Sequence, residues 1–238
     1  CQLYRAKQRG ELAMGMGEVM EAEGYRQRIA RGAAREVEDG MIINLGIGIP
    51  TLVADYIPRD KRVMFHAENG ILGTGPSPAK GKENPMLCNA GGFPVTLVPG
   101  ASFFDSATAF AIIRRGLLDM TILGVLEVSQ HGDIANWIVP GKRVPGMGGA
   151  MELAQKARKV LVVTTHLDKN GRSKIVRECS LPLTAPKAAN LIITDMAVME
   201  VLPDGLYLRE VMYPYSVPDV IGATEAELKV EGDVEVFR

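Results

Sequence analysis

The segment 159–165 constrains the fold of this chain more than any other stretch. It reads Lys-Val-Leu-Val-Val-Thr-Thr, so most of its residues are β-branched. Such residues favour strands, and an apolar run without polar alternation is typical of a strand that is covered on both faces. A similar run, Leu-Ile-Ile-Thr, occupies 191–194. Both segments predict central strands of a mainly parallel sheet.

Helical segments alternate with strand segments along most of the chain. An amphipathic helix is predicted over 21–38, because four apolar residues recur there at four-residue steps: Tyr25, Ile29, Ala33 and Val37. Further helices are predicted at 51–57, 105–115, 150–157 and 216–222, and further strands at 41–45, 63–67, 95–98 and 119–126.

The helix predicted at 105–115 has a candidate N-cap in Asp105. Its spacing places Phe110, Ile113 and Leu117 on the buried side. By contrast, residues 70–85 are rich in Gly and Pro and predict a loop.

The C-terminal part predicts a hairpin of strands 198–202 and 206–211 around Pro203-Asp204-Gly205, then an edge strand within 230–237. The alternation of helices and buried strands indicates an α/β fold, with an open, mainly parallel sheet that is flanked by helices. We expect one domain over 24–238, preceded by a polar arm at 1–23.

Glu68 is the first candidate for chemistry. It follows the apolar residues 63–65 and precedes the loop that begins at Gly70. A Glu at a strand end is more often solvated or paired with a cation than catalytic. The position of Glu68 nevertheless favours a catalytic role, because ligands of open α/β sheets bind beyond the carboxyl ends of the strands.

Two glycine-rich segments could approach such a ligand. Gly-Ile-Gly-Ile-Pro at 46–50 resembles half of a dinucleotide fingerprint, but Thr51 takes the place of the third glycine. The segment is therefore either a tight strand-to-helix turn or a close backbone approach to a ligand other than NAD. Gly-Met-Gly-Gly at 146–149 precedes a helix, so it is either a flexible turn or a set of N–H groups aimed at one oxyanion.

Composition argues against several classes of protein. With 27 basic and 28 acidic residues the net charge is −1, so no global field favours nucleic acid or an anionic membrane. No apolar run reaches the length of a membrane span, and we expect a cytoplasmic location. The cysteines, Cys1, Cys88 and Cys179, are far apart, which favours a reducing compartment.

Metal, serine-hydrolase and glycosidase chemistry also lack support. His66, His131 and His166 have no metal-binding spacing, and no Ser lies in a nucleophile elbow. A glycosidase would need a second catalytic carboxylate, and nothing singles out one of the available acids: Asp105, Glu127 and Asp133.

Several longer motifs occur in a characteristic order. They are Asn-Leu-Gly-Ile-Gly-Ile-Pro-Thr at 44–51, Glu-Asn-Gly-Ile-Leu-Gly at 68–73, Asn-Ala-Gly at 89–91, Asp-Ile-Ala-Asn-Trp at 133–137, Pro-Gly-Lys at 140–142, Gly-Met-Gly-Gly-Ala-Met at 146–151 and Cys-Ser-Leu-Pro-Leu-Thr at 179–184. Over about 25–211 the chain resembles the B (β) subunit of the two-subunit 3-oxoacid CoA-transferases of family I.

The resemblance implies that Glu68 is a covalent nucleophile and that Gly148 supplies an oxyanion N–H. It also implies substrate or CoA contacts from six residues: Asn44, Gly46, Gly48, Asn69, Lys142 and Gly149. CoA would move between short-chain carboxylic or 3-oxo acids through a glutamyl-CoA thioester. The acyl-CoA is then a substrate, with no tightly bound cofactor. The partner would be an A subunit, in an αβ or α2β2 assembly, and the loop 70–85 is a candidate lid.

Two positions depart from the family pattern. Ala67 stands where members usually have Ser, and Gly92 stands where many have Lys. Two rival functions also stay open. One is a sugar-phosphate isomerase that uses Glu68 as a base, although the glycine loops offer only Lys142 and Arg143 as phosphate-binding cations. The other is a non-catalytic CoA-binding subunit.

Overall fold

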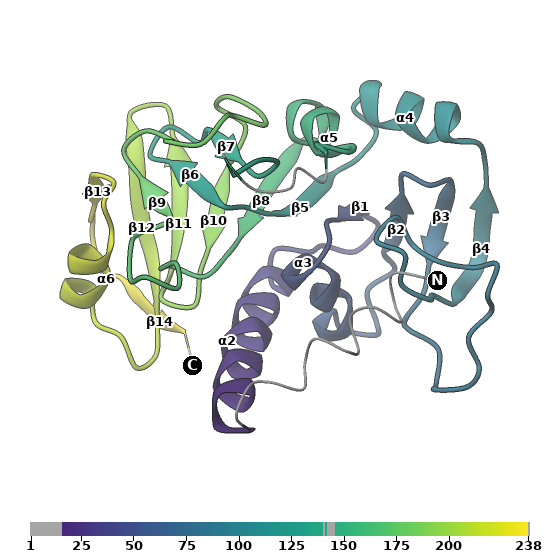
Figure 1. The fold of residues 1–238 in the computed structure, drawn as a ribbon, viewed down its shortest axis with the longest axis horizontal. Coiled ribbons are helices and arrows are strands. Elements are labelled where there is room, and N and C mark those ends of the chain that lie inside the picture. The colour runs from purple at the N-terminus through teal and green to yellow at the C-terminus, as the bar shows by residue number, and fades with distance from the viewer. Residues whose placement is uncertain (1–15, 140, 142–145, 238) are drawn as a thin grey trace.

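An 11-stranded sheet dominates the structure, a computed structural model that describes residues 16–139, 141 and 146–237 (Figure 1). Ten of its strands follow the order β13-β12-β11-β10-β8-β5-β1-β2-β3-β4, and β14 pairs with β12. The strands are β1 (Ile42–Leu45), β2 (Met64–Ala67), β3 (Ile71–Thr74), β4 (Leu97–Phe103), β5 (Met120–Gly124), β8 (Lys159–Val163), β10 (Leu191–Ile193), β11 (Ala197–Leu202), β12 (Gly205–Met212), β13 (Leu228–Lys229) and β14 (Glu235–Phe237).

The middle of this sheet is parallel. Strands β10, β8, β5, β1 and β2 pair in parallel. Antiparallel pairs extend the sheet on both sides, through β3 and β4 at one end and β11 and β12 at the other. The predicted fold class and the C-terminal hairpin are confirmed, and β8 lies at the centre of the sheet as its composition predicts.

The order of the parallel strands creates a switch point. From β1 the chain crosses to β2 on one side, and it later returns to β5 on the other side of β1 before continuing to β8 and β10. The connections after β1 therefore diverge, and a crevice opens beyond the carboxyl ends of β1, β2 and β5. The fold thus fixes where a ligand is able to approach before any side chain is considered.

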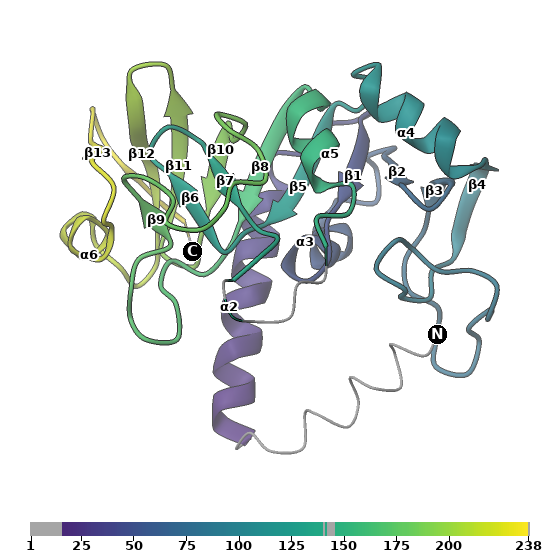
Figure 2. The same cartoon turned by 45° about the horizontal axis from the view of Figure 1, so that its top comes forward.

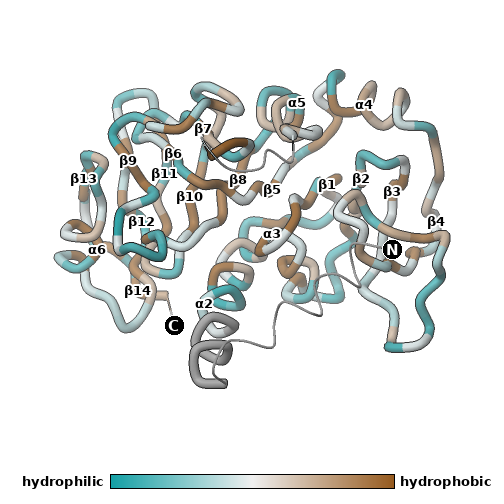
Figure 3. The backbone as a smooth tube through the Cα atoms, in the orientation of Figure 1, coloured by the Kyte–Doolittle hydropathy of each residue, from teal (hydrophilic) through white to brown (hydrophobic). Residues whose placement is uncertain are grey.

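Helices cover both faces of the parallel strands (Figures 1 and 2). Helix α2 (Met16–Ala34), α3 (Ile49–Leu52) and the 3-10 helix η2 (Val53–Tyr56) pack on one face, and α4 (Ser106–Arg114) and α5 (Ala150–Lys156) pack on the other. Helix α6 (Val217–Ala223) lies at the end of the sheet near β12 and β13, and its Val220 joins the core of α4 and α5. Strand β8 shows the consequence, since Leu161 and Val163 enter one core while Val160 and Val162 enter the opposite one. The hydrophobic stretches accordingly concentrate in the sheet (Figure 3).

Helix α2 follows the predicted amphipathic pattern with shifted ends. Ile29, Ala33 and Val37 are fully buried, and Tyr25 is half-buried. The regular helix ends at Ala34, four residues before the predicted end. Residues 35–37 instead donate to carbonyls three positions back, so a tightened turn continues the buried face. The predicted arm at 1–23 overlaps the start of α2, and its first 15 residues lie outside the described part of the chain.

Helix α4 confirms its predicted cap but not all of its predicted face. The Asp105 side chain accepts a hydrogen bond from the Thr108 backbone N–H at 2.7 Å, which satisfies one of the free donors of the first turn. Ile113 is fully buried, whereas Leu117 is 45% exposed, so its predicted burial is wrong. The helix ends at Arg114 and Gly116 adopts φ +65°, which breaks the helical period before position 117.

Two strands near the site differ from the prediction. Strand β3 lies inside the segment 70–85, which was predicted to be entirely a loop. Gly73 adopts φ +92° where the pairing with β4 shifts register, so this glycine marks a bulge rather than the absence of a strand. Strand β4 begins at Leu97 and runs through Pro99 because it forms the edge of the sheet, where a missing N–H is tolerated.

A second, three-stranded sheet was not predicted. It consists of β6 (Glu127–Ser129), β7 (Ile134–Ala135) and β9 (Ile175–Val176) in the order β7-β6-β9. Its strands have two or three residues each, which is too short for a period of two to stand out in the sequence.

His166 provides a test of this core. It is fully buried, and its two ring nitrogens hydrogen-bond the hydroxyls of Thr194 (3.0 Å) and Thr224 (2.9 Å). Burial lowers the pKa of His166 to about 4. The unfolded chain binds this proton near pH 6.5, so we expect the free energy of unfolding to fall by up to about 3 kcal/mol as the pH drops from 7 to 4.

Urea denaturation at several pH values measures this slope. His166→Gln replaces the titrating ring by a neutral amide and is expected to flatten the slope. His131→Gln is the matched control, because it removes an exposed imidazole in place of a buried one. Equal slopes for His166→Gln and the parent chain would contradict the assignment.

Candidate active site

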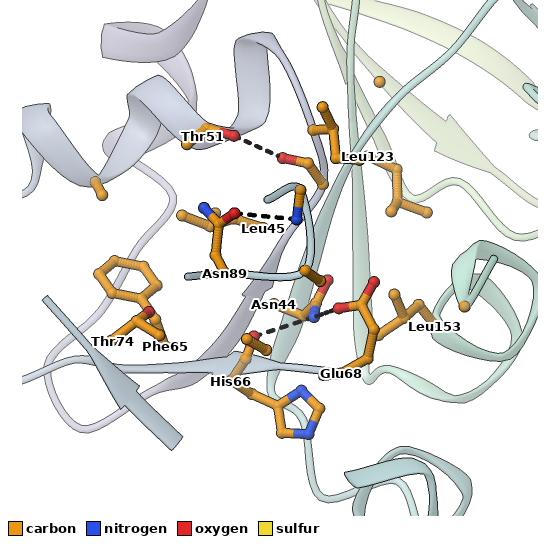
Figure 4. Close-up of a pocket in the computed structure, with 18 of the residues that line it drawn as sticks. Asn44, Leu45, Thr51, Phe65, His66, Glu68, Thr74, Asn89, Leu123 and Leu153 are labelled. Carbon is orange, nitrogen blue, oxygen red and sulfur yellow. Dashed lines mark hydrogen bonds between the residues drawn. The ribbon is translucent and has the colours of Figure 1, made fainter. Parts of the chain in front are cut away.

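A cavity of about 470 Å³ opens at the switch point of the sheet (Figure 4). Its walls include the carboxyl ends of three parallel strands, with Asn44 and Leu45 from β1, Glu68 just after β2, and Leu123 from β5. The glycine-rich segment 146–149 closes another side. The crevice that the strand order predicts is therefore a real cavity, and it contains the carboxylate singled out from the sequence.

Asn44 holds Glu68 in this cavity. The Asn44 Nδ2 group donates to Glu68 Oε2 at 3.0 Å and to the His66 carbonyl at 3.1 Å (Figure 4). Both partners are acceptors only, so the amide nitrogen, not the amide oxygen, must face them. A hydrogen bond to a carboxylate is stronger than one between neutral groups, which favours a single orientation of the Glu68 side chain.

The Asn44 amide belongs to a buried row of polar side chains. Asn44 pairs with His66 on β2 and with Thr121 on β5, so the three side chains share the face that α4 and α5 cover. Each is at most 2% exposed. Asn44 Oδ1, the Thr121 hydroxyl and both His66 ring nitrogens have no hydrogen-bond partner among the described residues. Unpaired buried polar groups destabilise a fold, so they mark a site where function takes precedence over packing.

His66 is held neutral beside this carboxylate. Burial lowers the pKa of its imidazole, and the nearby negative charge of Glu68 offsets part of that decrease. The ring stacks on Phe104 with centroids 6.0 Å apart. The His66 ring therefore packs against Phe104, while the backbone carbonyl of His66 orients the Asn44 amide.

The three residues of the Glu-Asn-Gly motif have different roles. Glu68 enters the cavity, whereas the Asn69 side chain donates to the Cys88 carbonyl at 2.8 Å and does not line the cavity. Gly70 adopts φ +109°, and a Cβ there would lie 2.1 Å from the Phe104 carbonyl oxygen. Asn69 thus ties the turn to the following loop, and Gly70 allows the start of α4 to approach it.

The two glycines of segment 46–50 also have different roles. Gly46 lines the cavity, and its N–H donates to the Ile122 carbonyl at 2.8 Å. A Cβ at Gly46 would lie 3.1 Å from that same oxygen, so the close approach is to β5. Gly48 adopts φ +96° at the N-cap of α3, two residues before Pro50, and does not line the cavity, which matches a tight strand-to-helix turn.

Segment 146–149 lies against the carboxylate. Gly146 and Gly148 have positive φ values of 95° and 57°, and both line the cavity. A Cβ at Gly149 would lie 3.6 Å from Glu68 Cγ and 3.3 Å from the Phe110 ring. The segment therefore has a specific shape, set by its glycines, rather than that of an arbitrary turn. Lys142 lies outside the described residues.

Sequence reasoning did not recognise the role of Asn89. Its Oδ1 atom accepts hydrogen bonds from the backbone N–H groups of Gly91 and Phe93, both at 3.0 Å. Asn89, Ala90 and Gly91 line the cavity opposite the strand ends. An Asn that precedes Ala-Gly-Gly is a turn signal, and this is the cue that could have revealed the loop.

Other ionisable candidates are engaged elsewhere. Asp105 caps α4, Glu127 accepts from the Ser180 and Leu181 backbone N–H groups, and Asp133 accepts from Ser129. None of these three acids lines the cavity.

Metal and thiol chemistry find no support in the described residues. Cys88 and Cys179 are free and half-buried rather than fully buried, and burial raises the pKa of the Cys179 thiol to about 12. Within 16–139, 141 and 146–237 no cluster of His, Cys, Asp and Glu could hold a metal ion. In the same part of the chain, no helix combines the length and the apolar character of a membrane span.

Comparison with known proteins assigns the family. The coenzyme A transferase family matches residues 26–223. The chain belongs to the coenzyme A transferase family. It is 56% identical to the beta chain of a probable coenzyme A transferase from Bacillus subtilis, over 87% of this chain and 95% of that protein. The sequence-based resemblance to a B-type subunit is thereby confirmed.

Two further relatives carry different names. The B-type subunit of a probable succinyl-CoA:3-ketoacid coenzyme A transferase from B. subtilis is 47% identical, over 88% of this chain and 97% of that protein. The beta chain of an acetate CoA-transferase from Escherichia coli is 45% identical, over 90% of this chain and 97% of that protein.

The fold also occurs in a solved coenzyme A transferase. An acyl-CoA transferase from E. coli O157:H7 superimposes with a TM-score of 0.71 at 20% identity. The match covers 90% of this chain and 43% of that one, so the present chain spans less than half of that protein. At this identity the likeness concerns the fold alone.

Asn44 is the residue through which this geometry is best tested. Asn44→Asp removes the donor to Glu68 and sets a second carboxylate against it. We expect kcat/KM for coenzyme A transfer to fall roughly 10–100-fold, since a hydrogen bond to a charged group contributes about 1.5–3 kcal/mol. Thr121→Val is the control, because Thr121 is equally buried in the same row but does not contact Glu68 through any hydrogen bond of the described residues. An Asn44→Asp enzyme as active as Thr121→Val would refute the role of the amide.

Proposed function

We propose that this chain is the catalytic B-type subunit of a CoA-transferase, with Glu68 as its covalent nucleophile. The observation that carries the proposal is the Glu68 carboxylate inside the switch-point cavity, oriented by the Asn44 amide and flanked by Gly149. Family membership supports the reaction class, and the names of the relatives support short-chain or 3-oxo acids as the partners in exchange.

The chemistry needs a carboxylate in this position. Glu68 attacks the acyl carbon of the donor thioester, the carbon–sulfur bond breaks, and the products are a mixed anhydride and a CoA thiolate. The thiolate then attacks the glutamyl carbonyl carbon, which releases the donor acid as a carboxylate and leaves a glutamyl-CoA thioester. An acceptor carboxylate reverses the two steps. Glu68 is regenerated, and no proton is gained or lost overall.

Each attack passes through a tetrahedral oxyanion, for which we propose the backbone N–H of Gly148 as a donor. The positive φ values on both sides of Met147 and the position of the segment in the cavity wall support this role. Loss of one such donor typically costs about 3–4 kcal/mol in the barrier. Gly46, Gly149 and Asn44 then form the wall around the reacting carbon, and Lys142 stays a predicted contact to CoA.

Water must be kept from the thioester, because hydrolysis would destroy it without transfer. Residues 71–74 of the predicted lid form strand β3 instead, whereas Gly75, Pro76 and Ser77 line the cavity. We propose that 75–85 forms the cover of the site. Gly48 and Asn69 do not line the cavity, and we propose structural roles for them in place of the predicted substrate contacts.

The rival isomerase function is less well supported. A sugar-phosphate site needs cations that converge on the phosphate, and no Lys or Arg lines the cavity among the described residues. The free, half-buried thiols Cys88 and Cys179 agree with a reducing, cytoplasmic location, which we propose.

A covalent adduct tests the mechanism directly. When the assembled enzyme is incubated with an acyl-CoA, mass spectrometry of its peptides is expected to find CoA on the peptide that contains Glu68. Glu68→Gln has nearly the same shape without the nucleophilic carboxylate and is expected to lower turnover by several orders of magnitude. Normal turnover of Glu68→Gln, or an adduct at another residue, would show that the mechanism is wrong.

We further propose that the chain works only with an A subunit, as an αβ or α2β2 assembly. The names of its relatives, which are subunits of the beta or B type, support this. The purified chain alone is expected to give no CoA transfer above background, and addition of its A subunit is expected to restore it. Activity of the single chain would contradict the proposal, and size-exclusion chromatography with light scattering would give the stoichiometry.

A further inference from the structure

Contacts, not backbone conformation, account for the glycine at position 149. Gly149 has φ −79° and ψ −3°, which lie in a region that residues with side chains also adopt. A Cβ at Gly149 would lie 3.3 Å from the Phe110 ring and 3.6 Å from Glu68 Cγ. A methyl group there would press on the ring beside the Glu68 side chain, so glycine lets segment 146–149 lie directly against both.

The contact with Phe110 joins this segment to helix α4. The N-terminus of α4 is fixed by the Asp105 cap, and the helix contacts α5, which lies beside it (Figures 1 and 2). The Phe110 ring is partly buried and packs against the core that α4 and α5 cover. Gly149 is the N-cap of α5, so the ring contacts the segment where that helix begins.

Arg114 links the same ring to α5. It lies four residues after Phe110 and therefore on the same side of α4. The carbon of its guanidinium group lies 5.6 Å from the centre of the Phe110 ring, at a distance typical of a cation–π contact. Its Nη2 atom donates to Glu152 Oε1 on α5 at 3.0 Å. The ring is thus held by a side chain that is itself paired with the helix after segment 146–149.

From these contacts we infer that Phe110 is a positioning residue for CoA transfer. Its ring sets how closely segment 146–149 approaches Glu68, and with it the place of the Gly148 N–H relative to the oxyanion. The inference rests on the proposed function and adds a residue that does not itself line the cavity. A displacement of about 1 Å can lower a rate about 100-fold, so loss of this contact acts on the chemical step more than on substrate binding.

Formation of the CoA adduct at Glu68 measures that step. The assembled enzyme is mixed with acetyl-CoA or succinyl-CoA, whichever loads the parent enzyme faster, and quenched samples are analysed by mass spectrometry. Phe110→Leu has a shorter side chain and is expected to lower the maximal rate about tenfold, with the half-saturating concentration within about threefold of the parent value. Phe110→Met reaches further and is expected to keep the rate within about threefold. A loss below threefold in Phe110→Leu, or an equal loss in Phe110→Met, overturns the inference.

A double-mutant cycle with Gly149→Ala tests the contact itself. In the parent chain the added methyl group presses on the ring, and the maximal rate is expected to fall about tenfold. In the Phe110→Leu background the methyl group enters the space that the ring has left, so Gly149→Ala is expected to raise the rate about threefold. An equal effect of Gly149→Ala in both backgrounds overturns the inference.

Ile113→Val is the control for destabilisation of α4. Ile113 lies on the same helix and is fully buried, and its truncation removes one methylene group from the core. We expect an adduct rate within about twofold of the parent rate, with urea denaturation as the measure of stability for every variant. An equal loss of rate in Ile113→Val and Phe110→Leu overturns the inference.

Failure of the inference and failure of the proposed function give different results. An adduct at Glu68 that forms as fast in Phe110→Leu as in the parent enzyme overturns only the role of Phe110. Absence of an adduct at Glu68 in the parent enzyme overturns the proposed function, and the inference with it.

Discussion

The site depends on one amide group that lies between two acceptors. Asn44 Nδ2 is shared by the His66 carbonyl and the Glu68 carboxylate, so it joins the backbone of β2 to the side chain that follows it. The arrangement exists only in one strand register, in which Asn44 pairs with His66. A slip of one residue would turn the Asn44 side chain to the opposite face of the sheet. The geometry at Glu68 is therefore fixed by the pairing of the parallel strands.

That register is in turn enforced by burial on both faces. In β1, Ile43 belongs to the core beneath α2, while Asn44 points to the side of α4 and α5. A polar residue is thus the exception on strands whose other side chains are apolar. Burial of the apolar neighbours stabilises the sheet. This stabilisation offsets the unfavourable burial of unpaired polar atoms in the row of Thr121, Asn44 and His66 beside the carboxylate.

Local sequence patterns were enough to predict the parallel centre, the Asp105 cap and the hairpin of β11 and β12, because each depends on neighbours in the chain. They also singled out Glu68 and the segment 146–149 at the cavity. Strand β3 escaped prediction because Gly73 reports a bulge only when β4 is present, and Pro99 is tolerated only because β4 is an edge. The hydrogen bond of the Asn69 side chain was not predicted for the same reason, since its partner, the Cys88 carbonyl, lies 19 residues away. Contacts between distant segments decided each of these cases.

The close approach at Gly70 bears on protein engineering. The Phe104 carbonyl fills the space that any larger residue would need, and the Phe104 N–H donates to the Gly70 carbonyl at 3.0 Å. A carboxylate held in this way therefore cannot be moved into another sheet as the tripeptide Glu-Asn-Gly alone. The smallest unit that a designer would have to graft comprises the β2–β3 hairpin, the strand that carries Asn44 and the segment that leads into α4.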